Sequence, residues 1–148
     1  MRRVLRLLVV GVLGLAASVF VASPANAEPS GPHYWMYTND NFSPHGGKVD
    51  FYSDGDHVKL CDTRADGRRV HLLVQDADNR YTVLYYLEAS GNGVCDAAHA
   101  SDGGSHNLPE GHCIYFDIWL TDSGVYILGS EDTAQWANDN EFKYNCNP

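Results

Sequence analysis

The sequence predicts an all-β protein, an antiparallel β-sandwich closed by two disulfides. Short apolar runs alternate with turn residues every eight to twelve positions through much of the region after residue 47. No segment there sustains the 3.6-residue period of a helix, and four cysteines lie in the same region. Regularly spaced short strands with turn signals between them are typical of sandwiches and barrels.

The N-terminal residues have the organisation of a secretory signal. Three arginines within the first six residues precede an uncharged apolar run over 7–22, and the small residues Ala25 and Ala27 follow it. The run is shorter than the ~20 residues of a membrane-spanning helix and ends without a basic stop. We therefore expect residues 1–27 to be removed on export, leaving a secreted, extracellular chain that does not insert into a membrane.

The mature chain is strongly acidic. Removal of the signal takes three arginines and no acid, so 7 basic and 19 acidic residues leave a net charge of −12. Nucleic acid is therefore a poor partner, because contacts to phosphate need lysine and arginine. About 120 residues remain, enough for one domain. We divide them into an aromatic N-terminal segment, 28–47, and a β-sandwich domain, 48–148.

Alternation of apolar and polar residues predicts six strands. Asp-Gly pairs lie in two of the turns between them and supply the positive φ that a tight turn requires. The resulting sandwich is expected to be immunoglobulin- or fibronectin-like, or jelly-roll-like. The predicted strands cover residues 49–53, 57–62, 70–76, 81–88, 113–120 and 125–129.

All four cysteines lie in the predicted mature chain. An even number in an exported chain indicates two disulfides, and the absence of a Cys-x-x-Cys pair argues against a zinc site. Three connectivities are open on spacing alone. We favour Cys95 with Cys113, which flank the long polar loop 94–112, and therefore Cys61 with Cys146, since closing that loop would restrict the unfolded chain.

The run over 47–70, GKVDFYSDGDHVKLCDTRADGRRV, resembles a sequence type of small, uncharacterised secreted proteins of actinobacteria. They share a strand, a Gly-Asp turn, a strand ending in Asp, then Ala-Asp-Gly and a further strand. Here these are Gly55-Asp56, Asp62 and Ala65-Asp66-Gly67, and a weaker likeness continues through 108–111. The resemblance implies a β-sandwich, export and a bacterial source, and it implies no activity.

The long loop contains residue types used in catalysis: His99, His106 and His112 with Asp96, Asp102 and Ser105. A hydrolase needs a nucleophile beside a base on a rigid scaffold. Neither a Gly-x-Ser-x-Gly turn nor a His-Glu-x-x-His helix is present. We therefore interpret these residues as polar positions of a solvated loop.

Four aspartates occupy two neighbouring turns, at positions 54, 56, 62 and 66. Clustered carboxylates are ligands for calcium, but this spacing is not that of the twelve-residue calcium loop. Aspartate also favours turns through bonds to its own backbone. The turn interpretation is preferred, and no metal or cofactor is expected.

The most informative pattern is a set of apolar and aromatic residues on the outward side of three predicted strands. This candidate binding face consists of His71, Leu84, Tyr86, Tyr115 and Trp119. Two interpretations are open: the face binds a ligand, or another part of the chain covers it. Cover by 34–37, or by Trp136 with the C-terminal tail, is favoured, since exposed patches of that size are uncommon.

These observations predict a non-enzymatic secreted protein that binds an extracellular protein or carbohydrate. One alternative is an inhibitor of an extracellular enzyme, with the loop 94–112 as its probe. A second alternative, which the missing motifs disfavour, is a small secreted hydrolase.

Export gives the first testable prediction. N-terminal sequencing of the protein from culture medium should start at Glu28, because Ala25 and Ala27 are the well-placed small pair after the apolar run. A sequence starting at Met1 would refute export by this signal.

Overall fold

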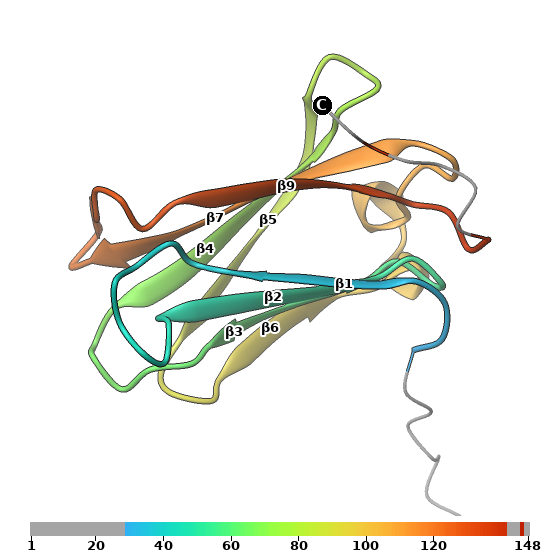
Figure 1. Ribbon diagram of the computed structural model, residues 1–148. Coiled ribbons are helices and arrows are strands. Elements are labelled where there is room, and N and C mark those ends of the chain that lie inside the picture. The colour runs from blue at the N-terminus through green and yellow to red at the C-terminus, as the bar shows by residue number, and fades with distance from the viewer. Residues whose placement is uncertain (1–28, 142–145, 147–148) are drawn as a thin grey trace, which may run out of the picture.

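Two antiparallel sheets packed face to face form the fold, as the sequence predicts (Figure 1). The structure is a computed structural model and describes residues 29–141 and 146. The predicted signal lies outside the described residues. The strands are β1 (His33–Tyr37), β2 (Gly47–Tyr52), β3 (His57–Asp62), β4 (Arg69–Asp76), β5 (Thr82–Ser90), β6 (Cys95–Ala98), β7 (Cys113–Asp122), β8 (Val125–Tyr126) and β9 (Asp132–Ala137).

The chain crosses repeatedly between the two layers. The first sheet has the order β1-β2-β3-β6, and the second has the order β5-β4-β7-β8, with β9 also paired to β7. β7 is therefore the central strand of the second sheet: β4 lies along one edge, while β9 and β8 share the other.

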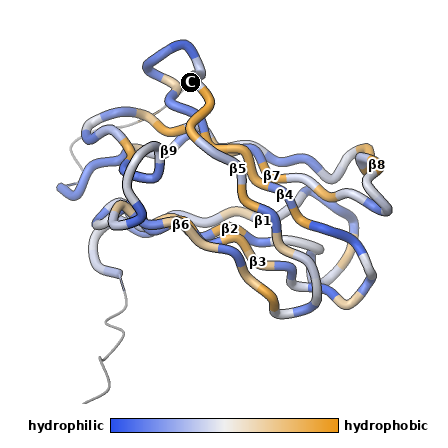
Figure 2. The backbone as a smooth tube through the Cα atoms, turned by 180° about the vertical axis from the view of Figure 1, so that it is seen from behind, coloured by the Kyte–Doolittle hydropathy of each residue, from blue (hydrophilic) through white to orange (hydrophobic). Residues whose placement is uncertain are grey.

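The core lies between the sheets and follows from two-residue alternation. In β7 the side chains of Ile114, Phe116, Ile118 and Leu120 are all 0% exposed. Phe116 packs on Phe51 of the first sheet with ring centroids 5.1 Å apart. Figure 2 shows that the hydrophobic residues concentrate on the strands and that the connecting loops are mostly hydrophilic.

The predicted strands correspond to β2, β3, β4, β5, β7 and β8, and the limits of β3 are those predicted. Three further strands, β1, β6 and β9, were not predicted. The loop 94–112 contains β6 and two 3₁₀ turns, Ala100–Asp102 and Gly104–His106, and it buries Leu108. No helix in the described part of the chain is long and apolar enough to cross a membrane.

The prediction that 34–37 covers the outward side of the second sheet is wrong. These residues form β1, the edge strand of the first sheet, and pair with β2. Met36 is only 7% exposed, and Tyr34 stacks on Trp136 at 5.6 Å. Because β1 contributes to the shared core, the sandwich begins inside the segment 28–47 and not at residue 48.

The favoured disulfide pairing is also wrong. The structure joins Cys61 to Cys95 and Cys113 to Cys146. The cause is topological: β6 pairs with β3, and Cys61 and Cys95 are direct cross-strand neighbours. The loop 94–112 is held instead by burial of Leu108, whose amide donates to the Asp56 carboxylate at 2.8 Å.

Removal of the Cys61–Cys95 bond should destabilise the protein substantially. The bond closes a separation of 34 residues, for which loop entropy predicts a loss of about 3–4 kcal/mol in the free energy of unfolding. Urea unfolding of the Cys61→Ala/Cys95→Ala variant measures the loss, and peptide mapping without reduction verifies the pairing. A Cys95–Cys113 peptide would contradict the structure.

Candidate functional site: the aromatic face of the second sheet

Alternation places a continuous set of side chains on the outward side of β5, β4, β7 and β9. We call this set the aromatic face. Each member is adjacent in sequence to residues on the inward side of its own strand. Its members are Tyr86 and Glu88 of β5, His71, Leu73 and Gln75 of β4, Tyr115, Asp117 and Trp119 of β7, and Thr133 and Gln135 of β9.

The strand register arranges these residues in rows across the sheet. The central row runs from Tyr86 through Leu73 and Asp117 to Thr133. On one side of it lies the row Glu88, His71 and Trp119; on the other lie Gln75, Tyr115 and Gln135. A carboxyl group therefore stands at the centre of the face, with aromatic residues in all three rows.

Asp117 has no counter-charge. Its Oδ1 atom is buried and has no hydrogen-bond partner, and no ion pair of Asp117 is found among the described residues. Burial, and next the negative charge of Glu131, raise the pKa of Asp117 to about 6. Keeping this carboxylate ionised at neutral pH thus costs free energy in the folded protein.

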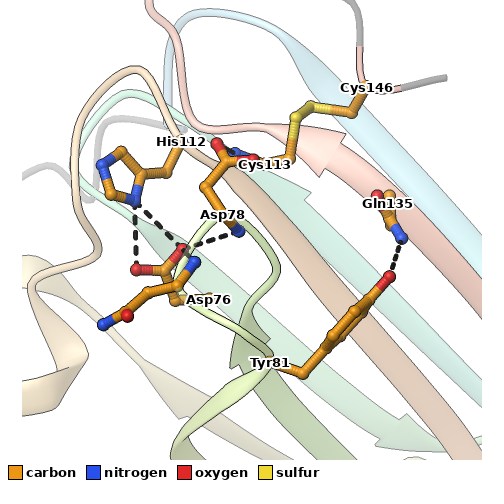
Figure 3. The surroundings of a disulfide bond; sticks show 8 residues. Asp76, Asp78, Tyr81, His112, Cys113, Gln135 and Cys146 are labelled. Carbon is orange, nitrogen blue, oxygen red and sulfur yellow. Dashed lines mark hydrogen bonds and ion pairs between the residues drawn. A yellow bond between two sulfur atoms is a disulfide. The ribbon is translucent and has the colours of Figure 1, made fainter. Parts of the chain in front are cut away.

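Two of the three aromatic residues around Asp117 are held by neighbours. Trp119 is half-buried and stacks on His71 at 5.4 Å. Tyr115 meets the edge of Tyr81 at 5.4 Å, and the Gln135 amide donates to the Tyr81 hydroxyl at 3.0 Å (Figure 3). Tyr86 differs, because it is 61% exposed. The face therefore combines fixed aromatic walls with one freely accessible ring.

A shallow depression of about 380 Å³ adjoins Trp119 at one end of the face. Its lining residues are Arg69, His71, Glu88, Thr121, Ser123 and Gly124. Arg69 forms an ion pair with Glu88, and His71 Nε2 lies 2.9 Å from the Thr121 hydroxyl. Burial lowers the pKa of His71. This end of the face thus offers hydrogen-bonding groups beside the rings.

The structure brings four of the five predicted residues, His71, Tyr86, Tyr115 and Trp119, onto one face. Leu84 is the exception, because it packs partly against the core. The pairing of β4 with β5 shifts between Val74 and Gln75, so that Leu84 has no direct partner. This β-bulge changes the phase of alternation in β5, and Val83, predicted to face inward, becomes exposed.

Neither predicted cover reaches this face in the described part of the chain. β1 belongs to the other sheet. Trp136 lies on the inward side of β9, with its ring 4.8 Å from that of Phe116. Both aromatic segments are thus used in the core, and the C-terminal tail, 142–148 apart from Cys146, lies outside the described residues.

The histidines of the loop 94–112 do not form one site. His112 Nδ1 lies 3.0 Å from both carboxylate oxygens of the buried Asp76 (Figure 3). His99 pairs with His57 through their Nδ1 atoms at 2.6 Å. The Asp76–His112 pair can orient an imidazole, but in the described residues the His112 side chain has no hydroxyl or thiol as a hydrogen-bond partner.

The turn aspartates bond mainly to backbone amides, as the turn interpretation predicts. Asp62 accepts from the amides of Arg64 and Gly91, and Asp66 accepts from that of Arg68. No group of three His, Cys, Asp or Glu side chains placed to hold a metal ion occurs among residues 29–141 and 146.

Replacement of Asp117 by Asn should stabilise the protein at neutral pH. The folded-state pKa of about 6 lies above the ordinary value of 3.8 for an aspartate carboxyl. The unfolded chain therefore loses the proton first, and wild-type stability falls as pH rises between these two values. Taken in full, this difference in pKa corresponds to ~3 kcal/mol in the free energy of unfolding. Solvent screening of this half-buried group reduces the expected gain to ~1 kcal/mol above pH ~6.

Urea unfolding at pH ~4 and ~7.5 measures this gain, which should be much smaller at the lower pH. Asp50→Asn is the matched control, because Asp50 is outward on the first sheet but bonded to Lys48 and His33. That variant should not be stabilised. Equal effects of the two substitutions on stability would contradict the conclusion that Asp117 has no counter-charge.

No protein-family model, curated protein or solved structure matches this chain. A functional assignment therefore depends on the chemistry of the aromatic face itself.

Proposed function

We propose that this chain is a secreted, non-enzymatic binding protein whose aromatic face contacts an extracellular ligand. The predicted signal and the two disulfides support an extracellular role. The face has the features of a recognition surface: accessible aromatic side chains, polar groups at its margin and a rigid sheet beneath them.

The Asp117 carboxyl, with an unpartnered Oδ1 atom and no ion pair among the described residues, is the observation that carries this proposal. A buried polar atom without a partner costs free energy, so its persistence calls for an explanation. The outward side of the first sheet offers a direct comparison. There Asp50 lies opposite Trp35 of β1, and its carboxylate is 2.8 Å from Lys48 Nζ and 2.9 Å from His33 Nε2. Asp117 has no such ion pair among the described residues, and a bound ligand would supply the counter-charge.

The inhibitor alternative has less support. It depends on a rigid loop 94–112 held by its own disulfide, and that disulfide is not formed. Part of the loop packs on the body of the sandwich, where Leu108 is buried and His106 contacts the ring of Tyr85.

Loss of the exposed Tyr86 ring and the half-buried Trp119 ring should weaken binding strongly. We expect Tyr86→Ala/Trp119→Ala to reduce retention at least ~10-fold on whichever member of a panel binds the wild type, because aromatic residues contribute heavily to interfaces. The panel comprises insoluble cellulose, insoluble chitin, immobilised polylysine and immobilised polyglutamate. Trp35→Ala is the matched control, since Trp35 is 57% exposed on the other sheet.

Retention should be unchanged in the Trp35 variant. Failure of the wild type to bind any member of the panel, or equal retention of both variants, would contradict a binding role for this face.

A further inference from the structure

We propose that the ligand of the aromatic face is cationic: a lysine or arginine side chain from a basic segment of a partner protein, seated over Asp117 beside Tyr86 and Trp119. This inference rests on the proposed function and names the ligand class for the same site. It follows from three properties of the face, namely its missing counter-charge, its surplus of negative charge and the arrangement of its rings.

The face contains a carboxyl group and no free cation to neutralise it. The Oδ1 atom of Asp117 has no hydrogen-bond partner, and no ion pair of the Asp117 side chain is found in the described chain. Arg69, the arginine of β4, is paired with Glu88. An ammonium or guanidinium group seated over this carboxyl would supply the missing counter-charge.

The surroundings of Asp117 favour a positive ligand over a negative one. After burial, the negative charge of Glu131 contributes to the raised pKa values of Asp117 and Tyr115. The predicted mature chain as a whole carries −12. This negative potential attracts a basic partner and repels an acidic one.

The aromatic rings suit a long basic side chain. Leu73 separates Tyr86 from Asp117 in the central row. Neighbouring strands lie ~4.8 Å apart, so these two residues stand ~10 Å apart. A lysine or arginine stem can lie over Leu73 with its charge at Asp117, in contact with the accessible ring of Tyr86. Cations bind favourably to the faces of Tyr and Trp rings.

A neutral saccharide is the competing ligand, since sugars also stack on aromatic rings and bond to carboxyl groups. The two classes respond differently to Asp117→Asn. Asparagine can still exchange hydrogen bonds with hydroxyl groups, but it cannot neutralise a cation. The substitution also leaves Tyr86 and Trp119 in place and is expected to stabilise the fold, so loss of binding would not reflect unfolding.

The experiment measures binding of pentalysine amide, pentaglutamate and chitopentaose to the disulfide-intact mature chain by calorimetry at low salt. Pentalysine should bind, and Asp117→Asn should weaken it at least ~10-fold. Asp50→Asn removes the same charge from the other sheet and should weaken it less than ~2-fold. Pentaglutamate should not bind.

The pH dependence gives a second readout. Wild-type affinity for pentalysine should fall ~10-fold between pH ~7.5 and ~5 as Asp117 takes up a proton. The other titratable groups facing Asp117 are Glu131, Tyr115 and Tyr126, with His71, Glu88 and Arg69 in the adjoining rows. Asp117→Asn retains all of them and should show a much flatter profile.

Equal weakening by Asp117→Asn and Asp50→Asn would overturn the inference, because it would show only general attraction to an acidic chain. Absence of pentalysine binding would overturn it as well. Chitopentaose binding that survives Asp117→Asn but is lost in Tyr86→Ala/Trp119→Ala would also overturn the cationic ligand, while supporting the proposed binding function of the face.

Discussion

Alternation along β7 is the constraint on which the rest of the structure depends. Four inward side chains of this strand are completely buried between the sheets, and each contributes about 1.5–3 kcal/mol through burial. A shift of one residue would bring all of them to the surface. The position of Asp117 between Tyr115 and Trp119 is therefore enforced by the core. The register of β7 with β4 and β9 also fixes the neighbours of Asp117 across the sheet, which are Leu73 and Thr133.

Much of the fold was accessible from the sequence, because strands such as β3 alternate cleanly and end at Asp-Gly turns. β1 was missed because Tyr34, Trp35, Met36 and Tyr37 are all apolar or aromatic, which hides their alternation. β9 was missed because it is mostly small or polar, with Trp136 as its large inward residue. Prediction of the disulfides required knowledge of which strands are neighbours. β3 pairs with β6, although β4 and β5, which lie between them in the sequence, belong to the other sheet.

The candidate site was predictable in outline and not in its chemistry. Period-two alternation identifies His71, Tyr86, Tyr115 and Trp119, and it also places Asp117 outward between two of them. Its lack of a partner depends on register: the flanking positions in β4 and β9 hold Leu73 and Thr133, and neither carries a positive charge. Leu84 was misplaced for a related reason, because a bulge leaves no clear mark in the residue pattern.

The two sides of β7 meet different neighbours, and this has a consequence for how such a protein can change over time. Outward substitutions leave the buried residues untouched, and surface changes typically alter stability by less than ~0.5 kcal/mol. Inward substitutions disturb a closely packed interior. Selection can therefore vary the chemistry displayed on this sheet while the frame beneath it stays the same. Descendants of one sandwich are expected to diverge in what they recognise long before they diverge in shape.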